Sequence, residues 1–215
     1  MNFMLEQVRR CLTQRATPSG EGLRSVDDRP ETLRSAAVLI LMLEVQDDWH
    51  LLYIRRAEND NDYHSGQVAF PGGCFEPSDD DLKATALREA HEEVGIAPND
   101  VEIVGRLGDL ISTTKFRIVP FVGVIPWPYS LRLAPSEVAR AFTIPLNWLS
   151  DPDNRELYEH TLSNTTVTVV RYRQYSGELL WGATARMTVS LVQTLTTDNN
   201  LKQARLAMRQ RQLTQ

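Results

Sequence analysis

The pattern of apolar and polar positions along this chain predicts several strands around one prominent helix. Ser35–Val45 is a continuous apolar run of strand length, which favours a strand buried on both faces. A polar turn at 46–48 separates it from Trp49–Arg55, whose alternating side chains predict a hairpin partner. Four more strands are expected, at Gly66–Phe70, Val101–Gly105, Thr113–Ile125 and Thr165–Tyr172. Because proline donates no backbone hydrogen bond, Pro120 predicts that its strand is an edge or bulged one.

Helical spacing predicts three further elements. Residues 2–15 have apolar side chains partly on one side and are expected to form an amphipathic helix that caps the domain. Ser136–Phe142 is expected to be a short helix, with Ser136 as its N-cap and Glu137 at its start. Thr184–Leu195 has a single apolar stripe and is predicted to be a helix that faces the core.

The segment Gly72–Ile96 concentrates acidic side chains on one predicted helix. Glu89, Glu92 and Glu93 stand at i, i+3 and i+4, so helical geometry projects them from adjacent turns of one face. Like charges this close repel each other, and a hard divalent cation such as Mg²⁺ turns that repulsion into affinity for an ion that prefers oxygen ligands. Arg88, next in sequence to Glu89, is expected to hold its carboxylate by a bidentate contact.

The flanks of this helix also have interpretable residues. Gly72 and Gly73 carry no Cβ and allow close approach to a ligand. The acids at 79–81 precede the apolar positions and favour the first turn of the helix. Gly95 predicts the point at which the helix ends.

This segment resembles the signature of the Nudix hydrolases, G-x5-E-x7-R-E-U-x-E-E-x-G-U, where U is apolar. Residues 88–96, REAHEEVGI, fit it position by position. The first half departs from it, because the sixth residue after Gly73 is Asp79 rather than glutamate and the spacer to Arg88 is one residue longer. This longer form, with a further acid at Glu76, resembles the coenzyme A pyrophosphatase branch of the family. The likeness extends in outline over residues 35–195.

The resemblance implies a fold, a reaction and a cofactor. The fold is expected to be α+β, with a mixed β-sheet sandwiched between α-helices. The reaction is expected to be metal-dependent hydrolysis of the diphosphate bond in a small-molecule nucleotide, with Mg²⁺ or Mn²⁺ as the cofactor. Homodimers are common in this fold, so a homodimer is also considered.

The resemblance also assigns roles to residues at matching positions. Glu89 and Glu93 are expected to be the principal metal ligands, with Glu92 sharing a second ion. Arg88 is expected to orient Glu89 rather than to bind substrate. The general base is left open between Glu92, Glu93 and Glu137, and Glu137 is the acid outside the signature that we would test first.

Other positions near the signature are candidates with less support. Asp79 and Glu76 are expected either to bind a second metal ion or to hold the loop. Gly72, Gly73 and His64 are candidate contacts for the substrate phosphates, although a loop histidine without such a role is at least as common.

Coenzyme A or its thioesters are the first candidate substrates, and the expected products are 3′,5′-ADP and 4′-phosphopantetheine. In the coenzyme A branch an arginine precedes the glycine matching Gly66 by four residues, but this chain has Asp62 there. Hydrolysis of ADP-ribose, NADH or a dinucleoside polyphosphate is therefore kept as an alternative, and it predicts weak discrimination for the 3′-phosphate. A catalytically silent nucleotide-binding module is the third possibility, which the presence of all three glutamates disfavours.

Composition and charge narrow the class of protein. The 215 residues are 42% hydrophobic and carry a net charge of −5, with a pI of about 5.4. A general nucleic-acid-binding protein needs a basic surface, so that class is excluded. Cys11 and Cys74 form no disulfide framework, and with no apolar run of membrane length or signal-peptide pattern, a cytoplasmic protein that does not act at a membrane is expected. We expect an N-terminal helix and linker at 1–34, one catalytic domain at 35–197 and a basic tail at 198–215.

Overall fold

The computed structural model describes residue 6 and residues 8–12, 33–59, 64–162 and 165–197. Residues 13–32 of the expected N-terminal helix and linker, Asp62 and the basic tail lie outside these residues. The described elements, in chain order, are β1 Arg34–Val45, β2 Asp48–Arg56, β3 Val68–Ala69, β4 Gly72–Cys74, α2 Leu82–Val94, η2 Pro98–Asp100, β5 Glu102–Arg106, β6 Leu110–Ile111, β7 Phe116–Val124, β8 Val138–Pro145, α3 Leu146–Ser150, η3 Pro152–Asn154, β9 Arg155–Leu162, β10 Thr165–Tyr172 and α4 Gly182–Thr197.

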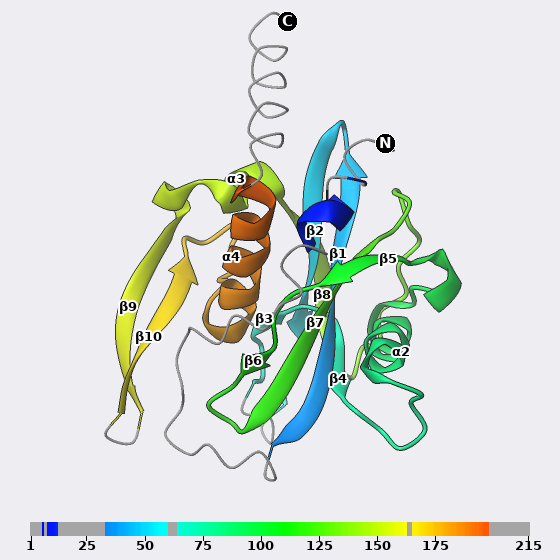
Figure 1. Ribbon diagram of the computed structural model, residues 1–215, viewed down its shortest axis with the longest axis horizontal. Coiled ribbons are helices and arrows are strands. Elements are labelled where there is room, and N and C mark those ends of the chain that lie inside the picture. The colour runs from blue at the N-terminus through cyan, green and yellow to red at the C-terminus, as the bar shows by residue number, and fades with distance from the viewer. Residues whose placement is uncertain (1–5, 7, 13–32, 60–63, 163–164, 198–215) are drawn as a thin grey trace, which may run out of the picture.

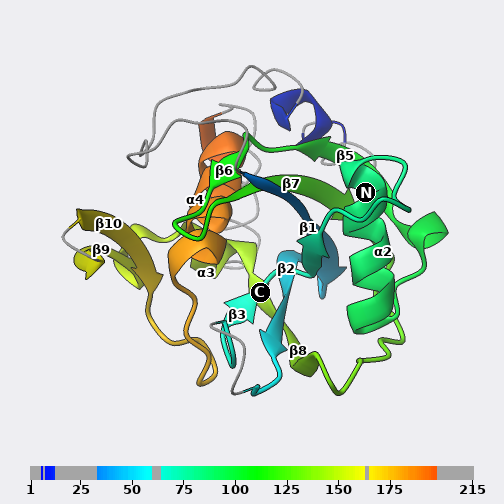
Figure 2. The same cartoon turned by 90° about the horizontal axis from the view of Figure 1, so that it is seen from below.

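A mixed sheet with helices on both faces forms the body of the protein, as expected from the resemblance (Figure 1). β1 is its centre, because it pairs antiparallel with β2 and β4 and parallel with β7. The view in Figure 2 places α4 and α2 on opposite sides of this sheet. The predicted helices at the signature and near the C-terminal end correspond to α2 and α4 and are confirmed.

The continuous apolar run of β1 is explained by two separate cores. Leu39 and Leu41 pack on one face with Ala86 and Ala90 of α2. Alternate residues such as Ile40 pack on the other face, in the core that also contains the stripe of α4. Because successive strand side chains point to opposite faces, a strand buried on both sides must be apolar throughout.

The predicted short helix at Ser136–Phe142 is wrong. Ser136 and Glu137 form a turn, and the chain continues as β8, which pairs antiparallel with β2. The backbone N–H of Val138 donates to Ala134 O at 2.8 Å, which closes the turn before the strand begins. A run this short has no decisive periodicity, so the exposed edge of β2 decides its conformation.

The prediction for Pro120 is also wrong in part, because β7 lies between β1 and β5 rather than at an edge. The irregularity lies instead in β5, where the register shifts between Ile103 and Gly105. Pro120 O accepts from Leu107 N at 2.9 Å. Since the N and C=O of one strand residue point to the same side, the missing N–H of Pro120 faces the interruption between β5 and β6.

Of the two strands beside α4, one was predicted and the other was not. β10 coincides with the predicted strand Thr165–Tyr172. Its antiparallel partner β9 was not predicted, because Arg155–Leu162 is rich in charge and carries no strong strand pattern. The pair forms a separate two-stranded sheet beside α4 (Figure 1).

The N-terminal helix is helical where it is described, at residue 6 and residues 8–12. Val8 and Leu12 are buried in the core on the α4 side of the sheet. A Cβ added at Gly105 of β5 would lie 2.6 Å from the Leu12 side chain, so the two elements pack closely. This agrees with the expected capping role. No helix among the described residues has the length and apolar character needed to span a membrane.

Candidate active site

The helix that carries the signature begins and ends at specific caps. Asp81 Oδ1 accepts from Ala84 N at 2.7 Å and is the N-cap, so the acids at 79–81 precede the first turn rather than lie in it. Gly95 has φ 74°, and its N–H donates to His91 O at 3.0 Å. Together with the bond from Ile96 N to Ala90 O at 3.4 Å, this is a Schellman ending that glycine favours.

Two glycines bring the backbone of β4 against the helix carboxylates. The N–H of Gly72 donates to Glu93 Oε2 at 2.9 Å. At Gly73 a Cβ would lie 2.6 Å from Glu89 Cδ, a distance that real Cβ contacts do not show. Gly72 therefore supports the Glu93 carboxylate directly, and Gly73 leaves the space that the Glu89 carboxylate occupies. Their expected contact with substrate phosphates stays a prediction.

Arg88 is organised around Asp79 rather than around Glu89. Its Nε and Nη2 atoms lie 2.8 and 3.1 Å from the two Asp79 carboxylate oxygens, which is a bidentate pair. Nη1 lies 2.8 Å from Glu92 Oε2 and 3.1 Å from Glu89 Oε1. The expected bidentate contact with Glu89 is wrong, because Asp79 takes the Nε and Nη2 donors and only Nη1 lies near Glu89.

Asp79 is the anchor of the loop before the helix. It also accepts from Glu76 N at 3.0 Å and from the buried hydroxyl of Thr85 at 2.9 Å. The hydrogen bonds from Arg88 hold the pKa of Asp79 well below its usual range. Of the two roles expected for Asp79, this arrangement matches holding the loop.

Replacing Asp79→Asn is expected to destabilise the protein by roughly 2 kcal/mol, because Arg88 loses the ionised partner of a largely buried pair. Equilibrium urea unfolding at pH 7 measures this difference. Asp80→Asn is the matched control, since Asp80 is exposed one residue further along the same loop. Equal unfolding free energies for both variants would contradict the anchoring role.

Glu93 is the most deeply buried acid of the helix, with 1% of its surface exposed. Burial raises its pKa to about 8, and the charge of Glu89 adds to the rise while the Gly72 N–H opposes it. Burial also raises the pKa of Glu89, against the effect of Arg88. A cation would remove the cost of keeping both groups ionised.

Glu137 reaches this site through the loop that follows β7. Ala134 N donates to Glu93 O at 3.0 Å, and Ala57 N donates to Glu137 O at 2.8 Å, so the loop bridges the end of α2 and the end of β2. The negative charge of Glu137 contributes to the raised pKa of both Glu89 and Glu93. The structure thus brings Glu137 to the side of the helix that carries the expected metal ligands.

The remaining predicted residues lie at the margin of this group. The Glu92 side chain is 52% exposed and pairs with Arg88, so it diverges from the buried Glu93. Glu76 is exposed, 4.0 Å from Arg88. His64 Nδ1 lies 3.2 Å from Gln67 Oε1 within its own loop. Sequence reasoning missed Arg56, whose Nη1 lies 3.9 Å from Glu93 Oε1. Its place directly after the predicted strand Trp49–Arg55 was the one available signal.

The donor set suits a hard divalent cation. Glu89, Glu93 and the more exposed Glu92 offer carboxylate oxygens, which Mg²⁺ and Mn²⁺ prefer. No three described carboxylate, His or Cys side chains already converge with the spacing of a metal site. Arg88 instead supplies the positive charge beside Glu89 and Glu92, and a cation would compete with it for these oxygens.

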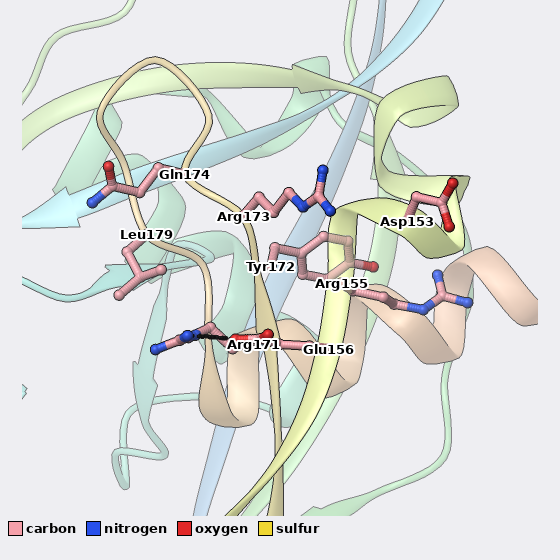
Figure 3. Close-up of a pocket in the computed structure, with 8 residues that line it drawn as sticks. All are labelled: Asp153, Arg155, Glu156, Arg171, Tyr172, Arg173, Gln174 and Leu179. Carbon is pink, nitrogen blue, oxygen red and sulfur yellow. Dashed lines mark hydrogen bonds and ion pairs between the residues drawn. The ribbon is translucent and has the colours of Figure 1, made fainter.

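A pocket with a volume of about 430 Å³ lies elsewhere, along η3, β9 and the chain after β10 (Figure 3). Most of its lining residues are charged or polar, and among them Arg171 pairs with Glu156. The hydroxyl of Tyr172, another lining residue, donates to Leu149 O at 3.1 Å. Figures 1 and 2 place β9 and β10 on the opposite side of the sheet from α2, so this pocket is separate from the carboxylate site.

Comparison with known proteins gives one family throughout. A family model described as the NUDIX domain matches residues 33–164. Proteins described as "Uncharacterized Nudix hydrolase NudL" are similar in sequence. The protein from Photorhabdus laumondii is 38% identical over 130 residues, which cover 60% of this chain and 69% of that protein. The one from Yersinia pestis (strain Pestoides F) is 36% identical over 165 residues, which cover 75% and 80%.

Solved structures with a similar fold include a MutT/nudix family protein from Enterococcus faecalis. Its TM-score is 0.48 at 13% identity, covering 82% of this chain and 64% of that one. A C. elegans Ap4A hydrolase gives a TM-score of 0.45 at 18% identity, covering 54% and 82%.

Proposed function

Since this chain belongs to the Nudix hydrolase family, we propose that it hydrolyses the diphosphate bond of coenzyme A or its thioesters, giving 3′,5′-ADP and 4′-phosphopantetheine. The observation that carries the chemistry is the buried Glu93 carboxylate. It lies beside Glu89, under the Gly72–Gly73 backbone and within the charge field of Glu137. An arrangement that keeps several acids together at the cost of raised pKa values is typical of a cation site. The domain that catalyses this reaction is proposed to span residues 35–197.

Each residue of the group has a task in this reaction. Glu89 and Glu93 would hold Mg²⁺ or Mn²⁺, and Glu92 would share a second ion. Bound metal supplies charge neutralisation for the diphosphate and lowers the pKa of an attacking water. Gly72 fixes the Glu93 carboxylate through its N–H, and Asp79 fixes Arg88 beside Glu89. Arg88 therefore orients the metal ligand Glu89, as the resemblance implies.

Glu137 is the proposed general base. It is exposed on a loop held to α2 by the bond from Ala134 to Glu93, so its carboxylate can approach a water on the solvent side of the site. Glu92 is the alternative base, but its carboxylate is committed to Arg88. The half-exposed position of Glu92 nevertheless leaves it accessible to a second ion.

A second substrate class is supported by one residue. Asp62 stands where the coenzyme A branch has an arginine, and an acid there repels a 3′-phosphate. ADP-ribose, NADH and dinucleoside polyphosphates contain the same diphosphate bond and are the alternative substrates. Equal turnover of coenzyme A and dephospho-coenzyme A would favour this alternative.

The test is a substrate panel of coenzyme A, dephospho-coenzyme A, ADP-ribose, NADH and a dinucleoside polyphosphate, with Mg²⁺, with Mn²⁺ and with chelator. Products are separated by chromatography. We expect metal-dependent cleavage of coenzyme A and loss of that activity in Glu89→Gln. Glu44→Gln, an exposed acid on β1, is the matched control and should behave as wild type.

The other outcomes of this panel separate the alternatives. Cleavage of ADP-ribose or another diphosphate with coenzyme A inert would retain the reaction and reject the coenzyme A branch. Tight nucleotide binding with no turnover under either metal would reject the enzyme in favour of a silent binding module.

A further inference from the structure

A buried acid outside the signature holds two arginines at the end of β2 and β8. Glu178 has 6% of its side chain exposed, and its Oε1 lies 3.0 Å from Arg140 Nη1 and 4.0 Å from Arg55 Nη1. Arg55 and Arg140 are partners in the register of the two strands. Two like charges directly opposite each other destabilise a sheet, so Glu178 offsets a repulsion that the strand pairing creates.

A tight turn delivers Glu178 to this position. Tyr175 and Glu178 exchange both backbone hydrogen bonds, each 3.0 Å long, and the two residues between them, Ser176 and Gly177, have φ values of 51° and 84°. Positive φ at both central residues is the geometry of a type I′ turn, which is rigid. The Glu178 carboxylate is therefore placed by backbone geometry rather than by a flexible loop.

The two guanidinium groups keep most of their hydrogen-bonding capacity. The Arg140 side chain is 51% exposed and that of Arg55 is 41% exposed. Each guanidinium has five N–H donors, and one buried carboxylate cannot use ten. Glu58 also lies 3.9 Å from Arg55, but its side chain is 84% exposed and screens that charge only weakly.

This arginine pair lies at the ends of the two strands that lead to the candidate active site, on the opposite face of the sheet from Glu93. Arg55 is followed directly by Arg56, which contacts the buried Glu93 on the other face of the sheet. Arg140 follows Glu137 by three residues at the start of β8. A ligand whose diphosphate lies at Glu89, Glu93 and Glu137 would have to extend past the ends of β2 and β8 to bring a second anionic group to Arg140 and Arg55.

We propose that Arg140 and Arg55, positioned by Glu178, bind a phosphate monoester of the substrate at a point remote from the bond that is cleaved. This inference rests on the proposed function. In coenzyme A the group is the 3′-phosphate. Asp62 offers no positive charge to this phosphate, and Arg140 and Arg55 supply it instead. Discrimination for the 3′-phosphate is therefore expected despite Asp62. Glu178 acts as a positioning residue and does not touch the substrate.

The test compares coenzyme A with dephospho-coenzyme A, which lacks the 3′-phosphate. In Arg140→Ala we expect kcat/KM for coenzyme A to fall by about 10- to 100-fold through KM, as for loss of a hydrogen bond to a charged group. For dephospho-coenzyme A, kcat/KM should fall by about threefold or less, which is roughly the effect of a substitution at an exposed position. Arg140→Lys should recover part of the preference because it retains the charge. Glu178→Gln should raise KM for coenzyme A and leave kcat within about twofold.

Arg173→Ala is the control, since Arg173 is an exposed arginine on the chain leading to the same turn. Equal losses on the two substrates in Arg140→Ala, or an unchanged preference, would overturn the proposal. Calorimetric binding of 3′,5′-ADP and of 5′-AMP tests it without turnover. If wild type hydrolyses neither substrate but prefers 3′,5′-ADP and Arg140→Ala loses that preference, the phosphate site stands and the proposed reaction fails.

Discussion

Glu93→Gln is expected to inactivate the protein while making its metal-free form more stable above pH 8. The amide cannot serve as an anionic metal ligand, so turnover should fall by at least ~10³-fold, which corresponds to about 4 kcal/mol of lost transition-state stabilisation. The Gln side-chain oxygen still accepts from Gly72 N, so the loop keeps its hydrogen bond. Steady-state kinetics with saturating Mg²⁺ measure the first effect.

The stability effect follows from the raised pKa of Glu93. Its pKa is about 8 in the folded protein and 4.5 in an unfolded chain, so the folded state binds the extra proton between these values. Stability of the metal-free wild type should therefore fall as pH rises from about 4.5 to 8, by on the order of 5 kcal/mol. Glu93→Gln should remove the part of this slope that Glu93 contributes, because the amide has no proton to lose, and leave the smaller part that comes from Glu89.

Thermal unfolding in chelator at several pH values measures the slope, with Glu44→Gln as the control acid. Added Mg²⁺ should raise the Tm of wild type and not that of Glu93→Gln, since a ligand stabilises only the state that binds it. An active Glu93→Gln enzyme, or an unchanged pH slope, would remove Glu93 from the role of principal ligand.

Gly72→Ala and Gly73→Ala are expected to fail in different ways, although the two residues are adjacent. At Gly72 the new Cβ would lie 2.6 Å from Val38 Cα, and φ is 155°, where L-residues are strained. The obstacle is backbone of the central strand, which cannot move, so we expect a loss of about 3 kcal/mol or more in unfolding free energy.

At Gly73 the new Cβ meets the far end of the Glu89 side chain instead. That side chain can rotate away, so Gly73→Ala should fold with near-normal stability. The displaced carboxylate should lower kcat/KM on the order of 10²-fold, as expected for a misplacement of about 1 Å. Urea unfolding and kinetics on both variants separate the two effects.

Gly108→Ala is the matched control, because no atom lies within 4 Å of its added Cβ. The distinction between the two glycines would be refuted if Gly73→Ala unfolded as easily as Gly72→Ala, or if it retained full activity.

The geometry of the helix that carries the signature was predicted correctly, because it is local in sequence. Helical spacing placed Glu89 and Glu93 on one helix, and Gly95 marked its end, because caps and periodicity depend on neighbouring residues. The same reasoning failed for the Arg88 contact. Spacing along a helix does not show that the preceding loop returns to place Asp79 beside the Arg88 guanidinium, nine residues away.

The signature helix, the buried strand Ser35–Val45 and the family could be predicted from the amino-acid sequence, since each depends on a pattern within one continuous segment. Features that depend on contacts between distant segments became visible in the folded protein. The tertiary structure made Ser136–Phe142 part of a strand on the edge of β2, set Gly72 under Glu93 and raised the pKa of that acid. It also brought Arg55, Arg140 and Glu178 together from three separate segments. Burial and charge at a site depend on the elements packed around it, and no local pattern records which elements those are.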